Sequence, residues 1–269
     1  MKIPSVLAVA ALLLPGTAYA QTSPVVMAAL GDSISAGFNA CGWYVSCASR
    51  SWSTGDDAEV NSHYLRLREL VPAVAGHNVN LAVPGSTSAD LAGQARAAVA
   101  KGAAYVTILI GAQDACVGSE KDMTPVDVFG RRVDEALAVL RPTGARVIVG
   151  SIPDLRRLWS VGKASMVARA FWTVGHICPS MLAEPSSTAR KDRLRRERVR
   201  ARVMAYNERL GESCLAYGPA CRYDGGAVFS FPYTLRHVSV WDYFHPSGDG
   251  QRALAEVTFD AVFSGGALV

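Results

Sequence analysis

The chain has 269 residues, half of them hydrophobic, and a formal net charge of +4. This length suits an α/β domain with a full core, and the apolar content excludes a disordered chain. The mild basic excess does not indicate a nucleic-acid partner.

The first twenty residues have the pattern of a secretory signal. Lys2 provides the positive start, residues 6–14 form a short apolar core, and Ala-Tyr-Ala at 18–20 matches a cleavage site. The apolar run is too short to span a bilayer. We expect cleavage after Ala20, a mature chain of residues 21–269 that forms one domain, and a secreted or periplasmic location.

Apolar strands alternate with helices along the mature chain. Strands are predicted at 24–30, 78–83, 105–110 and 146–150, with a fifth at 228–231, and helices at 63–71, 88–101, 125–140, 189–211 and 248–263. Ser88 is the predicted cap of the second helix. Residues 39–60 resemble a long ordered loop, and residues 154–188 are irregular to helical. This alternation predicts a three-layer α/β/α sandwich around a parallel sheet of about five strands, flavodoxin-like in plan.

Polar or glycine-containing turns follow three of these strands. Ser33 follows the first strand, Gly85 the second, and the segment 111–114 the third. Since the carboxyl ends of parallel strands meet at one edge of the sheet, we expect these three turns to converge there.

Ser33 and His245 are the candidate nucleophile and base. A serine hydroxyl needs a base within hydrogen-bond reach, and the base needs an orienting acid. Asp242 precedes His245 by three residues, so the two side chains can meet within one turn of loop. The plainer interpretations are that Ser33 only caps a following helix, and that His245 lies on the surface. Ser35 is a rival nucleophile that lies further from the strand end.

The other histidines lack such a setting, and we expect surface or packing roles for them. They are His63, His77, His176 and His237. The G-x-S-x-G elbow of α/β-hydrolases is not matched, because position 35 is serine.

Six cysteines lie in the mature part, and an even count in an exported chain favours disulfides. Six cysteines allow fifteen connectivities. Short loops favour Cys41–Cys47 and Cys214–Cys221, which leaves Cys116–Cys178. A zinc site is the weaker alternative, because no C-x-x-C pair is present.

Eight basic residues lie between Arg190 and Arg202 on a predicted helix whose inward stripe contains Val199 and Val203. We expect the arginines to lie on the outer face, either merely solvated or in contact with anionic lipid. Nucleic acid is disfavoured, because interleaved aromatic residues are absent. Three aromatic residues in the long loop line a substrate pocket or pack the loop on itself: Trp43, Tyr44 and Trp52.

Four sequence blocks together resemble the SGNH, or GDSL-type, hydrolases. They are Gly-Asp-Ser-Ile-Ser at 31–35, Asn-Leu-Ala-Val-Pro-Gly at 80–85, Gly-Ala-Gln-Asp at 111–114 and Asp-Tyr-Phe-His-Pro at 242–246. They occur in the family's order and span nearly the whole mature chain. Residues 51–55, 110–116 and the Cys178-Pro segment are most similar to the secreted phospholipase B-like branch.

The resemblance implies a catalytic triad of Ser33, His245 and Asp242, without metal or cofactor. It implies that the backbone N–H groups of Ser33 and Gly85 form an oxyanion hole. Gln113 takes the position of the family's third donor, an asparagine, and its amide lies one methylene further out. Asp32 and Asp114 are expected to brace their turns.

The sequence therefore predicts a monomeric serine esterase or lipase acting on acyl esters, which include phospholipids. Two alternatives stay open. One is a carbohydrate O-deacetylase of the same family, because fold and triad do not determine the acyl group. The other is a binding protein whose turnover is weakened by Gln113.

Overall fold

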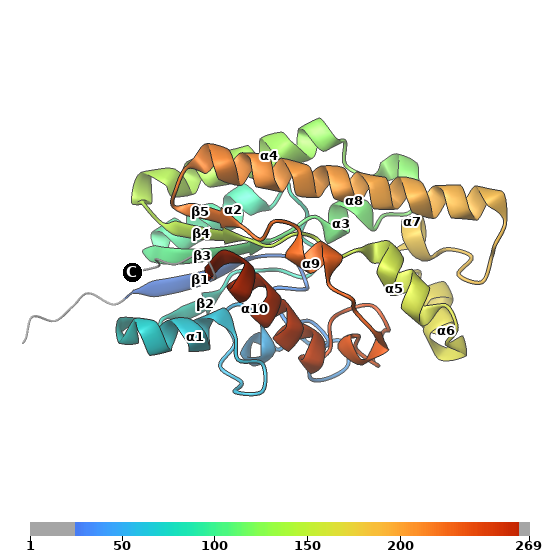
Figure 1. The fold of residues 1–269 in the computed structure, drawn as a ribbon, viewed down its shortest axis with the longest axis horizontal. Helices are drawn as coiled ribbons and strands as arrows, with labels where there is room; N and C mark the ends of the chain where they lie inside the picture. The colour runs from blue at the N-terminus through green and yellow to red at the C-terminus, as the bar shows by residue number, and fades with distance from the viewer. Residues whose placement is uncertain (1–24, 264–269) are drawn as a thin grey trace, which may run out of the picture.

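The structure, a computed structural model, describes residues 25–263. The predicted signal at residues 1–20 lies outside the described residues. Five parallel strands form one sheet in the order β2-β1-β3-β4-β5, the flavodoxin-like order (Figure 1). The strands are β1 (Val26–Gly31), β2 (Asn78–Asn80), β3 (Ala103–Leu109), β4 (Arg146–Val149) and β5 (Cys221–Tyr223).

Helices cover both faces of the sheet, so the predicted three-layer α/β/α sandwich is confirmed. In Figure 1, α4 and α8 lie above the sheet, and α1 and α10 lie below it. The helices are α1 (His63–Leu70), α2 (Leu91–Ala100), α3 (Ala112–Ala115), α4 (Val126–Leu140), α5 (Leu155–Gly162), α6 (Met166–Val174), α7 (Pro179–Leu182), α8 (Arg190–Tyr217), α9 (Ala227–Ser230) and α10 (Gly248–Phe263).

Alternation along the central strands divides the core between the two faces. Ala28 and Val106 belong to the larger cluster, which includes the buried residues of α2, α4 and α8. Their neighbours Met27 and Tyr105 belong to a smaller cluster with residues of α1 and α10. Because successive strand side chains point to opposite faces, continuously apolar strands are buried on both sides.

The register of the strands brings the predicted functional turns to one level. Gly31 pairs with Leu109, and the chain leaves β1 and β3 at the same edge. Gly31 has φ +137°, and a Cβ there would lie 2.0 Å from the carbonyl oxygen of Leu109. Only glycine allows the two backbones to approach this closely.

The cysteines form the three expected disulfides. The Cα atoms are 6.1 Å apart in Cys41–Cys47, 4.3 Å in Cys116–Cys178 and 5.3 Å in Cys214–Cys221. The first closes a loop beside the nucleophile turn, and the last joins the end of α8 to β5. The two short loops predicted from spacing are therefore confirmed.

The predicted fifth strand at residues 228–231 is wrong. Gly225 and Gly226 both have positive φ and turn the chain, and the side chain of Asp224 accepts the N–H groups of Gly226 and Val228. The following apolar residues therefore form the short helix α9. The fifth strand is instead β5, which has three residues and pairs with β4.

Candidate active site

Ser33 lies in a tight turn directly after β1. The N–H of Ala36 donates to the carbonyl oxygen of Asp32 at 3.0 Å and closes this turn, and the next helix is a single 3-10 turn at Ala48–Arg50. The interpretation of Ser33 as the cap of a following helix is therefore wrong. The free N–H groups here belong to a turn, which can also present donors to an anion.

His245 and Asp242 meet Ser33 across the sheet edge, although 212 positions separate Ser33 from His245 in the chain. The hydroxyl of Ser33 lies 2.8 Å from His245 Nε2, and His245 Nδ1 lies 2.5 Å from Asp242 Oδ2. Asp242 Oδ1 accepts the backbone N–H groups of Phe244 and His245 at 2.8 and 3.0 Å. The three side chains thus have the spacing of a nucleophile, a base and an orienting acid.

Asp242 is held as a carboxylate. Burial disfavours its charge, but the hydrogen bond and positive charge offered by His245, with two backbone N–H groups, outweigh that effect. The pKa of Asp242 therefore lies below its ordinary value.

A cavity of about 680 Å³ opens over Ser33 and His245, and both Gly85 and Gln113 line it. Gly85 has φ +85° in its Pro-Gly turn. The side-chain amide of Gln113 is folded back, with Nε2 3.4 Å from the carbonyl oxygen of Cys116. The structure therefore brings Ser33, Gly85, Gln113 and His245 to one cavity, and Asp242 joins them through its bond to His245.

The turns that carry Gly85 and Gln113 are bonded to each other through Asp114. Its carboxylate accepts the N–H of Ser88 at 2.8 Å and the hydroxyl of Ser88 at 2.7 Å. The bracing role expected for Asp114 is confirmed. The predicted helix cap at Ser88 is wrong, because its hydroxyl is used here and α2 begins only at Leu91.

Asp32 is buried behind the nucleophile. One carboxylate oxygen accepts the N–H of Ile34 at 2.9 Å, and the other has no hydrogen-bond partner within residues 25–263. Burial raises the pKa of Asp32 to about 7, although the Ile34 N–H and the nearby His245 act in the opposite direction. The bond to Ile34 fits the bracing role expected for this residue.

The three loop aromatics have different environments. Tyr44 lines the active-site cavity. Trp52 is fully buried and donates to Ser35 Oγ at 3.3 Å, so it packs the loop on the nucleophile turn. Trp43 is 69% exposed beside Tyr44. Tyr44 therefore has the predicted place in the pocket lining, and Trp52 has the alternative role of packing the loop.

Among the remaining histidines, His63 is fully buried, as a packing role requires. His237 bonds locally to Thr234. His176 is exposed, as a surface role requires, and it also lines the same cavity as Ser33.

Many basic side chains between Arg190 and Arg202 bind other parts of the chain. Arg196 is 1% exposed, stacks over the ring of Trp159 and donates to the carbonyl oxygen of Glu184 at 2.7 Å. The expectation that the arginines all lie on the outer face is therefore wrong. Other pairs on this helix are Arg198–Glu120, Arg200–Asp154 and Arg195–Asp192.

Two buried amides at the site were not predicted. Asn39 donates to Asp242, and Gln94 bonds both backbone groups of Gly31 and also Ser86. Gln94 left a signal in the sequence, because it lies three residues after Leu91 on the apolar face of its predicted helix. No local sequence pattern marked Asn39, because its partner Asp242 lies 203 positions away in the chain.

Across residues 25–263, the structure contains no helix long and apolar enough to cross a bilayer. The same residues contain no group of three or more histidine, cysteine or acidic side chains that could hold a metal.

Comparison with known families and structures gives a consistent result. The family model described as GDSL-like Lipase/Acylhydrolase matches residues 27–258. Among curated proteins, none matches this chain. An α/β hydrolase from the metagenome of Lake Arreo, Spain, is 18% identical, with a TM-score of 0.55 over 91% of this chain and 98% of that one.

Two further solved structures have the same fold. An acetylxylan esterase from Geobacillus stearothermophilus is 14% identical, with a TM-score of 0.55 over 90% of this chain and 95% of its own. A putative GDSL-like lipase from Parabacteroides merdae is 15% identical, with a TM-score of 0.50 over 89% of this chain and 96% of its own. At these identities the likeness establishes the fold alone.

Proposed function

The chain belongs to the GDSL-like lipase/acylhydrolase family, and from that premise we propose that it hydrolyses carboxylic esters through an acyl intermediate on Ser33. The observation that carries this proposal is the 2.8 Å contact between Ser33 Oγ and His245 Nε2 inside the cavity. Oxygen and nitrogen at this distance can exchange a proton directly.

In the first half of the reaction, Ser33 Oγ bonds to the ester carbonyl carbon as His245 Nε2 takes its proton. Asp242 holds Nδ1–H and balances the charge of the imidazolium. His245 then gives the proton to the departing alcohol oxygen as the ester C–O bond breaks, which leaves the acyl group on Ser33. Water repeats the sequence, with His245 as its base, and releases the acid.

The carbonyl oxygen carries negative charge in both tetrahedral intermediates. We assign the backbone N–H groups of Ser33 and Gly85 as its donors, with the side chain of Gln113 as the third. The Gln113 amide must leave the carbonyl of Cys116 to take part. Because one donor of this kind is worth about 10²–10³ in rate, the proposed enzyme turns over more slowly than one with the amide already in place.

Two features support an acyl group longer than acetyl. An apolar cavity of about 60 Å³ adjoins the site, and Leu155, Leu158, Phe244 and His245 are among the residues that line it. Apolar side chains are also exposed near the site. Helix α6 lies beside the loop that carries Asp242 and His245, because Trp172 Nε1 donates to the carbonyl oxygen of Tyr243 at 2.9 Å.

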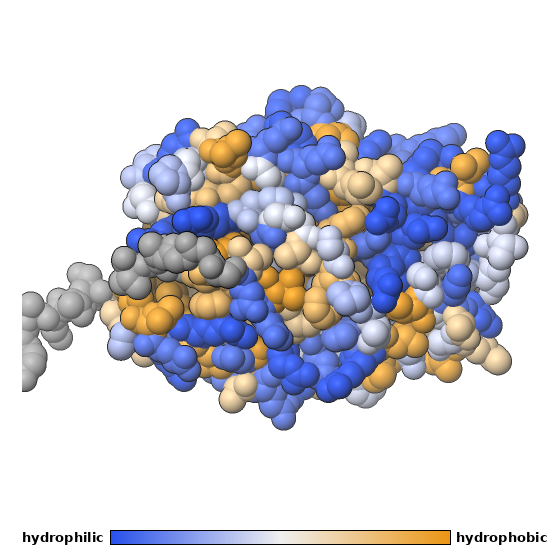
Figure 2. Space-filling model, viewed as in Figure 1, coloured by the Kyte–Doolittle hydropathy of each residue, from blue (hydrophilic) through white to orange (hydrophobic). Residues whose placement is uncertain are grey.

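The exposed side of α6 includes Met166, 76% exposed, and Val174, 81% exposed. Figure 2 shows apolar surface over the α5–α6 end of the molecule, as well as other apolar patches on the same face. These features favour a lipid-like ester, and the resemblance of residues 51–55 and 110–116 to the phospholipase B-like branch supports phospholipids as proposed substrates.

Contact with anionic lipid through the segment from Arg190 to Arg202 is a secondary proposal. Its support is now limited to the basic side chains at the start of α8, since Arg195, Arg196, Arg198 and Arg200 bind partners within the chain. Charge reversal at Arg190 and Arg193 should lower binding to vesicles that contain anionic lipid without changing hydrolysis of a soluble ester. Unchanged binding would refute this role.

We also propose that the protein acts outside the cytoplasm. Three disulfides within residues 25–263 suit an oxidising compartment, and the predicted signal at residues 1–20 supports export.

A series of p-nitrophenyl esters from acetyl to palmitoyl tests the proposed function, with Ser33→Ala as the control. Hydrolysis that favours medium or long chains and disappears in Ser33→Ala is the expected result. Activity on acetyl alone would favour the carbohydrate deacetylase. Hydrolysis that is absent, or that survives in Ser33→Ala, would refute the acyl-Ser33 mechanism and favour a binding protein.

A further inference from the structure

The side-chain amide of Asn39 lies between the proposed catalytic acid and the wall of the substrate cavity. Asn39 Nδ2 donates to Asp242 Oδ2 at 2.7 Å, and this is the same oxygen that accepts His245 Nδ1–H. Asn39 Oδ1 accepts the backbone N–H of Tyr44, a cavity residue, at 2.6 Å. Asn39 is only 3% exposed, so water does not compete strongly for either bond.

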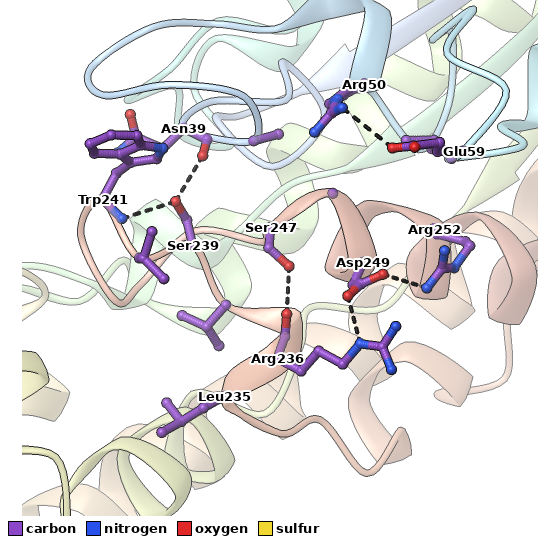
Figure 3. A pocket seen from close by; sticks show the side chains of 15 residues that line it. Asn39, Arg50, Glu59, Leu235, Arg236, Ser239, Trp241, Ser247, Asp249 and Arg252 are labelled. Carbon is purple, nitrogen blue, oxygen red and sulfur yellow. Dashed lines mark hydrogen bonds and ion pairs between the residues drawn. The ribbon is translucent and has the colours of Figure 1, made fainter.

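The backbone around Asn39 holds this amide in place. Asn39 has φ +59°, a left-handed conformation, in the segment that leads into the Cys41–Cys47 disulfide loop. Its carbonyl accepts the hydroxyl of Ser239 at 2.8 Å, as Figure 3 shows. Ser239 also donates its N–H to the carbonyl of His245 at 2.8 Å. Asn39 is therefore fixed relative to the loop that carries the proposed base.

We propose that Asn39 is a positioning residue, which fixes the carboxylate of Asp242 and sets how strongly that carboxylate holds the His245 ring. The inference rests on the proposed function. Asp242 Oδ1 is held by two backbone N–H groups, whereas Oδ2 is held only by side chains, from Asn39 and His245. Among the residues that the structure describes, Asn39 is thus the one donor besides the base itself that keeps Oδ2 aligned.

Removing the amide has two consequences. The carboxylate gains freedom to rotate away from His245 Nδ1, so fewer molecules have an aligned base. The remaining carboxylate also becomes a stronger acceptor, because no amide N–H shares its charge, and it stabilises the protonated form of His245 more. The first consequence lowers kcat, and the second moves the acid side of the pH profile upward.

Of the other titratable residues that line the cavity with His245, Tyr44 is bonded to Asn39, and the bond is made by its backbone N–H and not by its phenol. Asp32 acts on His245 through its charge from behind the nucleophile turn. His176 lines the same cavity as His245, and His237 lines the adjoining apolar cavity. A changed pH profile in an Asn39 variant is therefore assigned to Asp242.

Asn39→Gly tests the proposal, because glycine accepts the left-handed backbone and removes only the side chain. Asn61→Gly is the matched control, since Asn61 is exposed, has φ +49° and lies outside the site. In Asn39→Gly, kcat on a p-nitrophenyl ester should fall about 10- to 100-fold, as for loss of one hydrogen bond to a charged group, with KM within about threefold of wild type. The pH of half-maximal activity on the acid side should rise by about 0.5–1 unit. Asn61→Gly should match wild type in kcat, in KM and in the pH of half-maximal activity.

Asn39→Asp provides a second variant of the same size, which keeps the acceptor for the Tyr44 N–H but presents oxygen in place of the donor. It should lose at least as much kcat as the glycine variant and move the acid side in the same direction. Wild-type kcat and pH profile in either folded Asn39 variant would overturn the inference.

The failure of this inference is distinguishable from failure of the proposed function. If wild type hydrolyses esters and Ser33→Ala does not, the proposed function stands, whatever Asn39 does. The NMR titration of the His245 ring needs no turnover, and its midpoint should also rise in Asn39→Gly. An unchanged midpoint would overturn the inference even where no ester is hydrolysed.

Discussion

Asp32 and His63 are both fully buried, and burial displaces their pKa values in opposite directions. The pKa of His63 is lowered from 6.5 to about 3 by burial, with a smaller effect from the charge of Arg66. Its ring nitrogens lie 3.1 Å from the hydroxyl of Tyr105 and 2.8 Å from that of Thr258. The pKa of Asp32 is raised from 3.8 to about 7 by burial.

These shifts give the stability opposite dependences on pH. Between about pH 3 and 6.5 the unfolded chain protonates at His63 and the folded protein does not, so its contribution to stability falls as the pH falls. Between about pH 3.8 and 7 the folded protein is protonated at Asp32 and the unfolded chain is not, so its contribution falls as the pH rises. Each slope approaches about 1.4 kcal/mol per pH unit, and the two nearly cancel in the shared window.

Replacing one of the two residues should leave the pH dependence of stability that comes from the other. We expect the unfolding free energy of Asp32→Asn to rise by about 2 kcal/mol, relative to wild type, between pH 4.5 and 6.0, because only His63 then titrates. In His63→Gln it should fall by about 2 kcal/mol over the same range, because only Asp32 titrates. Urea unfolding, followed by the fluorescence of the buried Trp52 and Trp172 with the disulfides intact, measures both.

The comparison uses slopes, so a uniform loss of stability from either substitution does not affect it. The double variant is the control, and its pH dependence should return to that of wild type. Two parallel curves, or slopes of the same sign, would show that these groups titrate in the folded protein much as they do in the unfolded chain.

Two further predictions concern the proposed chemistry. Gln113→Asn shortens the amide that now reaches Cys116, and should raise kcat/KM on p-nitrophenyl acetate at least about tenfold, since one oxyanion donor is worth about 10²–10³. An unchanged rate would show that residue 113 is not a misplaced donor. Asp242→Asn should lower kcat by about 10⁴, as loss of the orienting acid does in serine hydrolases. A loss of less than about tenfold would show that Asp242 is not needed to orient His245.

The sequence predicted those parts of the molecule that depend on periodicity or on local motifs. The inward stripe of α8 is an example, because Val199, Val203, Tyr206 and Leu210 are all fully buried. The parallel sheet followed likewise from continuously apolar strands. The error at residues 228–231 has a local cause, since a short apolar run fits a strand or a helical turn, and two positive-φ glycines before it decided the outcome.

Contacts between distant loops could not be predicted in this way. Asn39 bonds Asp242 only because the disulfide loop and the catalytic loop fold against each other, and no local pattern records that contact. Ser88 has the composition of a helix cap, yet its hydroxyl serves Asp114 in the neighbouring turn. In both cases a tertiary partner overrides the local preference of a polar side chain.

The absence of a regular helix directly after Ser33 explains why buried amides surround the nucleophile. A turn satisfies fewer of its own backbone groups than a helix does, and buried groups need partners from elsewhere. Asn80 of β2 donates to the carbonyl oxygen of residue 35 at 2.8 Å, and Gln251 of α10 donates to that of residue 34 at 2.9 Å. Together with Gln94 of α2 on Gly31, three separate elements hold the turn.

These bonds form when the chain folds and do not depend on a substrate. They hold the backbone on both sides of Ser33, so we expect its N–H and hydroxyl to need little ordering when an ester binds. Hydrogen-bond donors stabilise a transition state most effectively when they need no reorganisation during the reaction. On this reasoning the proposed backbone donor at Ser33 is already aligned in the free protein, and Gln113 is the proposed donor that still has to move.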